Sequence, residues 1–303
     1  MLDIVVLGAA AGGGFPQWNS NAPACQRARS GDPAAPARTQ ASIAVSGDGV
    51  SWYVLNASPD LRAQINATPD MHPKEGLRST PIRGVFLTSG EIDAIIGLLT
   101  LRERQPFGLY ATKQVLGQLT ANPIFSALDS SIVPRNTLEL DQPVPLEPAG
   151  LSITPFAVPG KVPLYAERGE NPAEVMTNGE NIGLEITDGR ARALFIPGCA
   201  LMTDDLRTRI RGADAVFFDG TLWTDDEMIR AGLGSKTGRR MGHMSIADTP
   251  DGTIESFRSL DVRRKILIHI NNSNPVLLAE TPERAKAEQA GWDVAFDGMK
   301  ITL

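Results

Sequence analysis

The stretch from Gly84 to Leu101 constrains the fold of this chain most, because it reads as strand, turn and helix in succession. Its first residues, GVFL, form a short apolar run typical of a buried strand. A polar turn follows, after which Ile95, Ile96, Leu98 and Leu99 recur at the spacing of one helix face. Because ligands of α/β proteins bind where strands end and helices begin, this turn is a candidate site.

The charge and hydropathy of the chain exclude several classes of partner. The 303 residues carry a formal net charge of −6, which argues against nucleic acid or an anionic membrane. Every apolar run is shorter than the roughly 20 residues that a membrane span needs. The first residues, MLDIVVLG, lack the basic segment of a signal peptide. We therefore expect a globular, cytoplasmic protein.

The segment after the first strand is rich in glycine. Gly8 to Gly14 fits a nucleotide-binding loop only weakly, since Pro16 and the polar residues after it do not open a helix. A ligand-binding loop and a plain turn are equally good interpretations. Ala22 to Arg38 is rich in Ala, Pro and Arg, so we expect a poorly ordered surface excursion. Cys25 lies in it without a nearby Cys or His, and we expect no role for it.

Two hairpins are predicted from turn residues between apolar runs. Ser42 to Val45 and Ser51 to Leu55 flank Gly-Asp-Gly, and Ile182 to Thr187 and Arg192 to Ile196 flank Asp-Gly. Strands and helices recur in both halves of the chain without a linker or repeat. This order predicts an α/β (α+β) protein with two mixed sheets face to face and helices outside. We expect residues 1–303 to form a single domain.

Carboxylates follow two of the predicted strands directly. Ser89, Glu91 and Asp93 stand at alternate positions of the turn after GVFL, and Asp219 ends the apolar strand AVFF. Asp93 is equally suited to binding a metal and to capping the helix that follows. Glu91 fits a solvated turn residue slightly better than a ligand, and Asp219, taken alone, also fits a turn.

Two of the chain's three histidines fall at candidate site positions. His269 lies at the end of the strand Lys265 to Ile270, where a histidine is more often a buried core residue than a ligand. His243 lies in GHMS, before a predicted helix that Ser245 would cap, and a structural role is open for it. His72, in a loop between prolines, is predicted to be a surface residue.

The central turn resembles a known signature. LTSGEIDAIIGL is similar to LTHxHxDHxxGL of the metallo-β-lactamase superfamily. Ser89 and Glu91 stand at its first two histidines, Asp93 at its aspartate and Ala94 at its last histidine. FFDGTLW places Asp219 at the superfamily's metal-bridging aspartate.

The resemblance extends over nearly the whole chain. GHMSI places His243 at a catalytic histidine of phosphodiesterase-like members, and LIHINNS places His269 at their last metal histidine. Within the superfamily, the chain resembles the family of coenzyme PQQ biosynthesis protein B, through VVLGAAAGGGFPQWN, NASPDLRAQI, TSGEIDAIIGLLTLRE, VPGKVPLY, FFDGTLW, GHMSI and LIHINNSNP. This resemblance implies an αββα sandwich and a role in making pyrroloquinoline quinone (PQQ) from a peptide with linked Glu and Tyr.

The departures from the signature bear on the metal. All three of its histidines are missing, which removes most of the nitrogen ligands of a dizinc hydrolase, so we expect no zinc-dependent hydrolysis. Some members of the family also carry a cysteine cluster after WN that suggests a structural zinc. This chain has only Cys25 in WNSNAPAC, so we predict that the structural zinc is absent.

The remaining residues predict a divalent metal, most simply Fe(II), although an oxygen-rich site also suits manganese or magnesium. Two histidines and a carboxylate that leave open positions are the ligands of non-haem iron oxygenases. The activity proposed for the family, hydroxylation of the tyrosine ring of a Glu–Tyr-derived intermediate, fits this set. The resemblance makes His269 and Asp219 ligands and His243 a ligand or a proton donor. Glu91 and Asp93 would be ligands or orienting groups.

Four residues are candidates for contact with the substrate, a small-molecule or dipeptide PQQ precursor. Lys161 in VPGKVPLY suits an anionic group, although a lone loop lysine is usually solvated. Trp18 and Trp223 suit stacking on an aromatic ring, although aromatic residues more often serve packing. Ser89 lies in the central turn. A homodimer is compatible with the sequence.

Two other functions stay open. A carrier would hold PQQ or its precursor in a degenerate site without turnover, assisting its transport or release. A hydrolase that trims the precursor peptide is the weaker alternative, because the histidine losses argue against it.

Overall fold

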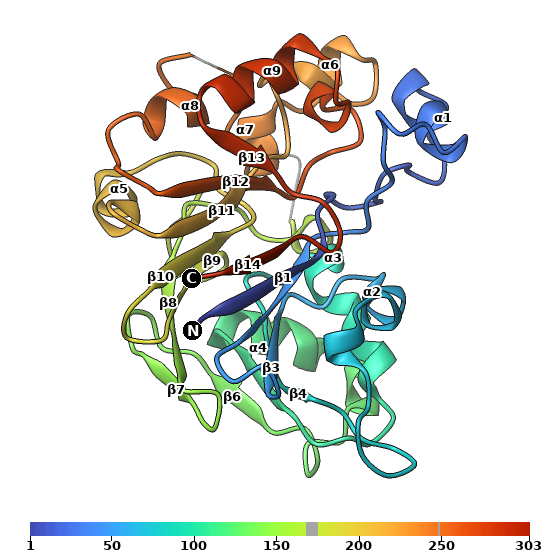
Figure 1. Ribbon diagram of the computed structural model, residues 1–303, viewed down its shortest axis with the longest axis vertical. Helices are drawn as coiled ribbons and strands as arrows, with labels where there is room; N and C mark the ends of the chain where they lie inside the picture. The colour runs from blue at the N-terminus through green and yellow to red at the C-terminus, as the bar shows by residue number, and fades with distance from the viewer. Residues whose placement is uncertain (168–174, 248) are drawn as a thin grey trace.

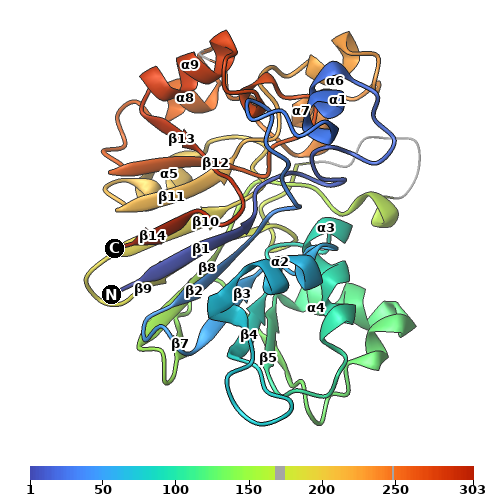
Figure 2. The same ribbon diagram turned by 45° about the vertical axis from the view of Figure 1, so that its right-hand side comes forward.

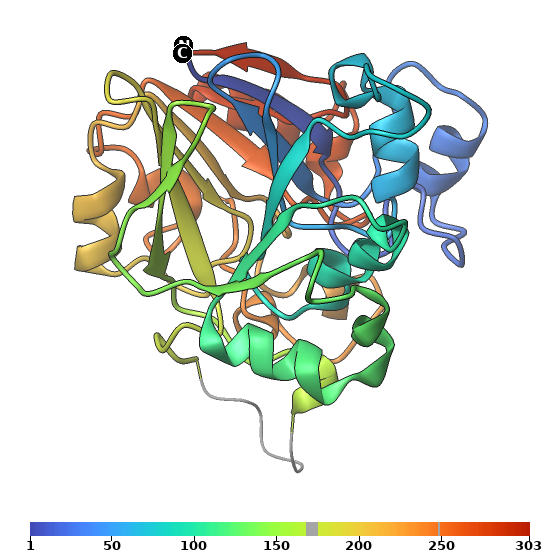
Figure 3. The same cartoon turned by 90° about the horizontal axis from the view of Figure 1, so that it is seen from below.

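The computed structural model describes residues 1–167, 175–247 and 249–303, which form two mixed sheets packed face to face with helices on both outer faces (Figure 1). The first and last strands pair with each other, so the two termini lie side by side (Figure 3). The αββα sandwich expected from the sequence is confirmed. Within the described residues, no helix combines the length and apolar character that crossing a membrane requires.

The first sheet has the strand order β14-β1-β2-β3-β4-β5-β6. Its strands β14, β1, β2 and β3 pair antiparallel, and β3 to β6 pair parallel. Their bounds are β1 Asp3–Gly8, β2 Ser42–Ser46, β3 Trp52–Leu55, β4 Ile82–Phe86, β5 Gly108–Ala111, β6 Arg135–Thr137 and β14 Lys300–Thr302.

The second sheet has the order β13-β12-β11-β10-β9-β8-β7. Here β7 to β10 pair antiparallel and β10 to β13 pair parallel, so β10, β11 and β12 end at the same edge. Their bounds are β7 Val144–Leu146, β8 Leu151–Ala157, β9 Ile182–Thr187, β10 Arg192–Ile196, β11 Ala215–Asp219, β12 Arg264–Ile268 and β13 Trp292–Val294.

Helices cover the two outer faces (Figure 2). On the first sheet lie α2, α3 and α4, and on the second lie α5, α8 and α9. The α-helices are α1 Pro23–Arg29, α2 Leu61–Ala67, α3 Ile92–Ile95, α4 Lys113–Ala121, α5 Asp204–Ile210, α6 Glu227–Arg230, α7 Gly238–Met241, α8 Thr253–Ser256 and α9 Pro282–Gln289. Short 3₁₀ helices are η1 Pro69–Met71, η2 Ile96–Leu101, η3 Pro123–Ala127, η4 Leu164–Ala166 and η5 Pro275–Leu277.

Alternate residues of each strand serve different apolar layers. In β1, Ile4 and Val6 point between the sheets, and Val5 and Leu7 point toward α2. Because both faces of the sheet are covered, β1 reads as a continuous apolar run rather than an alternating one. Both predicted hairpins are confirmed as β2/β3 and β9/β10.

Two sequence-based expectations about local structure are wrong. Ala22 to Arg38 contains α1, which begins at Pro23, a favoured first helical residue, and Cys25 is fully buried. Ser245 does not cap a helix, because it pairs in a β-bridge with Leu222 and the next helix, α8, begins at Thr253.

The helix predicted after the central turn is also modified. It is α-helical only over α3 and continues as the 3₁₀ helix η2, whose Gly97 lies directly on the backbone of Ser58. A Cβ built on Gly97 would lie 2.0 Å from Ser58 O, so the close approach depends on glycine.

We predict that Gly97→Ala destabilises the fold by about 2 kcal/mol or more, because the new methyl group meets backbone that cannot move alone. Gly117→Ala in the exposed face of α4 is the matched control, since a Cβ there meets nothing within 4 Å. It should stabilise by roughly 0.5–1 kcal/mol through helix propensity. Chemical denaturation measures both, and equal stabilities of the two variants would contradict the packing of η2 on Ser58.

Candidate metal centre

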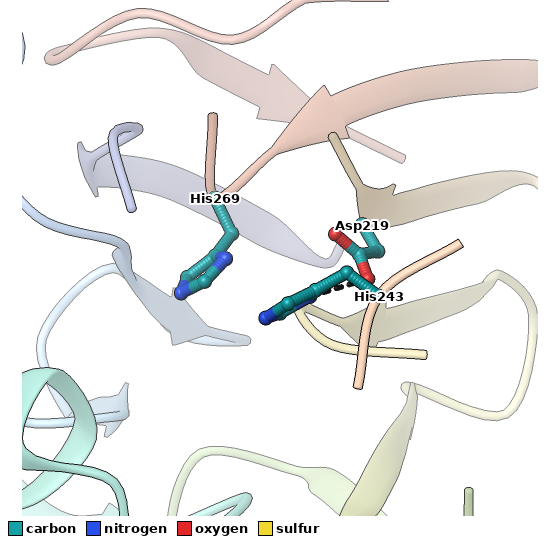
Figure 4. Close-up of side chains that lie close together, drawn as sticks. All are labelled: Asp219, His243 and His269. Atoms are coloured by element: carbon teal, nitrogen blue, oxygen red, sulfur yellow. Dashed lines mark hydrogen bonds and ion pairs between the residues drawn. The ribbon is translucent and has the colours of Figure 1, made fainter. Parts of the chain in front are cut away.

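The candidate site lies at the edge where parallel strands of the second sheet end. Asp219 is the last residue of β11 and is fully buried, and His269 directly follows β12. The register of the two strands pairs Asp219 with Ile268, which makes Asp219 and His269 neighbours. His243 follows α7 and reaches the same place from the segment that bridges to Leu222 (Figure 4).

Asp219 is held by four hydrogen bonds. Its Oδ2 accepts from Cys199 N at 2.8 Å and contacts His243 Nδ1 at 2.7 Å. Its Oδ1 accepts from Thr221 N at 3.0 Å and from Thr221 Oγ1 at 2.7 Å. A buried carboxylate needs such partners, and with these it has a fixed orientation. The other ring nitrogen of His243 points away from Asp219 (Figure 4).

His269 adopts an unusual backbone conformation. Its φ is +58°, in the left-handed region that costs a non-glycine residue roughly 1–2 kcal/mol. Its Nε2 lies 2.9 Å from Asp93 Oδ2, and its ring stacks on that of His243 with centroids 5.2 Å apart. The strained backbone thus turns the ring toward both Asp93 and His243, as expected of a functional position.

These residues fit a divalent metal ion. One carboxylate oxygen of Asp219 and one ring nitrogen each of His243 and His269 lie within 4.8 Å of one another. Two imidazoles and a carboxylate form the donor set of mononuclear non-haem iron, and zinc or manganese also accepts such ligands. Asp93, in contact with His269, supplies a further carboxylate.

The electrostatics of the site favour a positive charge. Burial alone lowers the pKa of His269, but Asp93, followed by Asp219 and Glu91, raises it above its ordinary value. Burial raises the pKa of Asp93, but the hydrogen bond and charge of His269 outweigh it and lower that pKa. The carboxylates around His269 thus favour a positive charge at this place, as a bound divalent ion would supply.

The site opens into a cavity of about 540 Å³, a size typical of small-molecule sites. Within the described residues its lining includes six of the predicted site residues: Ser89, Glu91, Asp93, Lys161, His243 and His269. The glycine loop reaches it as well, with Gly12 and Gly13 in the lining. The Glu91 side chain is still 34% exposed, and partial burial, only partly offset by Lys161, raises its pKa.

Both tryptophans lie outside this lining. The Trp18 side chain is 85% exposed, and Trp223 packs against the apolar layer outside the second sheet. Lys161 is buried rather than solvated. His72 does not line the cavity, and its Nε2 lies 3.0 Å from Asn66 O. The cavity therefore brings the histidines, carboxylates and Lys161 together without either tryptophan.

Sequence reasoning missed Thr221. Its hydroxyl lies 3.1 Å from His243 Nδ1, 2.9 Å from His269 Nδ1 and 2.7 Å from Asp219 Oδ1. A hydroxyl has one donor and two acceptor sites, so donation to Asp219 leaves its lone pairs for imidazole N–H groups. The only sequence signal was its place two residues after Asp219, where side chains often bond the turn backbone.

Comparisons with known proteins show the family to which this chain belongs. Residues 51–270 match the family model of the β-lactamase superfamily domain. "Coenzyme PQQ synthesis protein B" of Gluconacetobacter diazotrophicus is 71% identical, and that of Gluconobacter oxydans 58%, each over 100% of this chain and 99–100% of the relative. The crystal structure of Zn(2+)-bound PqqB from Methylobacterium extorquens superposes with a TM-score of 0.95 at 49% identity, over 99% of this chain and 100% of that one.

The fold and the strand-end cluster of histidines and carboxylates define a member of the metallo-β-lactamase superfamily. Identity over the full length then places the chain in a particular branch. It belongs to the coenzyme PQQ synthesis protein B family. The resemblance drawn from the sequence is thereby confirmed, whereas the absence of a structural zinc near Cys25 stays a prediction.

We predict that Thr221→Val weakens metal binding by roughly 10–100-fold, because both imidazoles and Asp219 lose the hydroxyl that orients them. Competition with a chromophoric chelator measures the affinity without any assay of activity. Thr221→Ser keeps the hydroxyl and is the matched control, expected to bind within a few-fold of wild type. Equal affinities of the Val and Ser variants would show that the hydroxyl does not position the ligands.

Proposed function

We propose that this protein, which takes part in PQQ synthesis as a member of its family, is an iron-dependent hydroxylase. Its substrate would be the tyrosine ring of a Glu–Tyr-derived PQQ precursor. The observation that carries the proposal is the cluster of Asp219, His243 and His269, whose two histidines line a cavity large enough for a dipeptide. Two imidazoles with one carboxylate suit Fe(II) that leaves positions open for other ligands.

The ion would be held by Asp219 and His269, with His243 and Asp93 beside them. When bound, Fe(II) would supply the capacity to activate dioxygen. Hydroxylation inserts one oxygen atom of O₂ into a ring C–H bond, and the second leaves as water after uptake of two electrons and two protons. A reductant such as ascorbate must therefore be present.

The chain's own residues would handle orientation and protons. With Nδ1–H donated to Asp219 Oδ2, the remaining nitrogen of His243 is an acceptor that can take the proton of a phenol. Asp219 fixes this tautomer and cannot rotate, because Cys199 N and Thr221 hold both of its oxygens. Leu222, Met228 and Met241 line the cavity nearby and give an aromatic ring an apolar, water-poor surface.

Protein loaded anaerobically with Fe(II) should consume oxygen and add one oxygen atom to L-glutamyl-L-tyrosine in the presence of ascorbate, as measured by mass spectrometry. His269→Ala should abolish this product, because it removes a ligand, and His72→Ala should not, because His72 lies outside the cavity. In His243→Gln, loss of iron would identify a ligand, whereas retained iron without turnover would identify a proton acceptor. Absence of oxygen uptake by the iron-loaded wild type would overturn the proposal.

A second function is favoured by a specific observation. Three signature histidines are absent, while Lys161 and Lys236 line the cavity and suit a ligand with several carboxylates. A carrier would bind PQQ stoichiometrically and without turnover, and removal of metal by a chelator would not change the binding. The zinc-bound relative keeps peptide hydrolysis as a third, weaker candidate, which requires zinc-dependent cleavage of the precursor.

A further inference from the structure

Two lysines that are not part of the candidate metal centre lie in the wall of the same cavity. Lys161 precedes η4, and Lys236 lies between α6 and α7, so two distant segments supply them. Both contact one carboxylate: Lys161 Nζ lies 3.0 Å from Glu167 Oε1 and Lys236 Nζ 3.1 Å from Glu167 Oε2. Each oxygen of Glu167 therefore has its own ammonium group.

Lys161 is fixed in place before any ligand arrives. Its side chain is only 10% exposed, and its Nζ also contacts Val162 O at 3.2 Å and Glu91 Oε1 at 3.6 Å. Asn181 Nδ2 donates to its backbone oxygen at 2.6 Å. Its stem packs on Gly242, where a Cβ would lie 3.4 Å from Lys161 Cγ. Because Gly242 precedes His243, this contact keeps the lysine beside the metal cluster.

Glu167 joins the two lysines, and its side chain is 17% exposed. Within the described part of the chain, its carboxylate contacts only these two ammonium groups, and they hold the pKa of its carboxyl below the ordinary value, with the Lys161 hydrogen bond as the main cause. It follows the short η4 turn, which Tyr165 fastens by donating to Gly90 O at 2.7 Å. A buried ammonium needs a counter-ion, and the Glu167 carboxylate serves without lining the cavity itself.

We propose that Lys161 and Lys236 form a carboxylate-binding subsite, and that the Glu167 carboxylate occupies it until a carboxylate of the ligand takes its place. The exchange keeps the charge balanced, since one carboxylate replaces another. The ligand would be an aromatic compound with at least one carboxylate, bound with that group at the lysines and its ring toward His243 and His269. The aromatic ring of this ligand rests on the proposed function, whereas its carboxylate is inferred from the two lysines alone.

The test is calorimetric binding of L-glutamyl-L-tyrosine to metal-free protein, in which no metal ion competes for the carboxylates. Lys236→Met should weaken binding roughly tenfold, since an ammonium partner is lost. Glu167→Gln should tighten it several-fold, because the competing internal carboxylate is gone. L-Glutaminyl-L-tyrosine amide, which lacks carboxylates, should show neither change. Lys74→Met, an exposed loop lysine outside the cavity, is the matched control and should bind as wild type does.

Three results would overturn the subsite. The first is unchanged or weaker binding of the dipeptide by Glu167→Gln at an unaltered melting temperature. The second is that the amide binds as tightly as the dipeptide. The third is that neither wild type nor Glu167→Gln binds the dipeptide measurably. Lys161→Met is informative only if it folds, so Lys236→Met and Glu167→Gln carry the test. Binding as expected without hydroxylation would leave the subsite standing and remove the proposed enzyme. Hydroxylation by the wild type, with Glu167→Gln binding the dipeptide no more tightly than wild type does, would support the enzyme and remove the subsite.

Discussion

The buried carboxylate of Asp219 is the group on which the site depends. It ends β11 with no exposed surface, and every hydrogen bond that it accepts fixes something else: Cys199 N, the Thr221 backbone and hydroxyl, and the ring of His243. Leaving such a group without partners would cost several kcal/mol, so the surrounding loops are bound to its position. The parallel register of β11 and β12 then brings His269 alongside, and the left-handed backbone of His269 turns its ring toward Asp93.

The cavity contains two groups of side chains that attract ligands of opposite charge. Carboxylates and imidazoles at the strand ends attract a divalent cation, whereas Lys161 and Lys236 attract an anion. Glu91 connects the two groups, because it lines the cavity with Asp93 and its Oε1 lies 3.6 Å from Lys161 Nζ. A cavity of this kind suits a ligand that is aromatic at one end and acidic at the other. The zinc-bound relative shows that a protein of this family can hold a divalent metal, and the choice of iron is our proposal.

The sequence predicted the strands, hairpins and sheets better than it predicted the contacts between side chains in the site. The two hairpins, the facing sheets and the strand-end positions of Asp219 and His269 followed from apolar runs and turn residues. Thr221 and Lys236 were missed because their roles arise from side chains that meet across distant segments. Trp18 was expected near the substrate but its side chain is exposed, since nearness in sequence to a site loop does not set a direction. The carboxylates of the central turn line the cavity, and whether they bind a metal directly stays a prediction.

The most direct test of the central claim is anomalous diffraction at the iron absorption edge from crystals loaded anaerobically with Fe(II), with elemental analysis of the same sample. The claim predicts about one iron per chain and a single strong peak in contact with Asp219 and His269. A peak elsewhere would contradict it, as would iron-free protein that nonetheless hydroxylates the dipeptide.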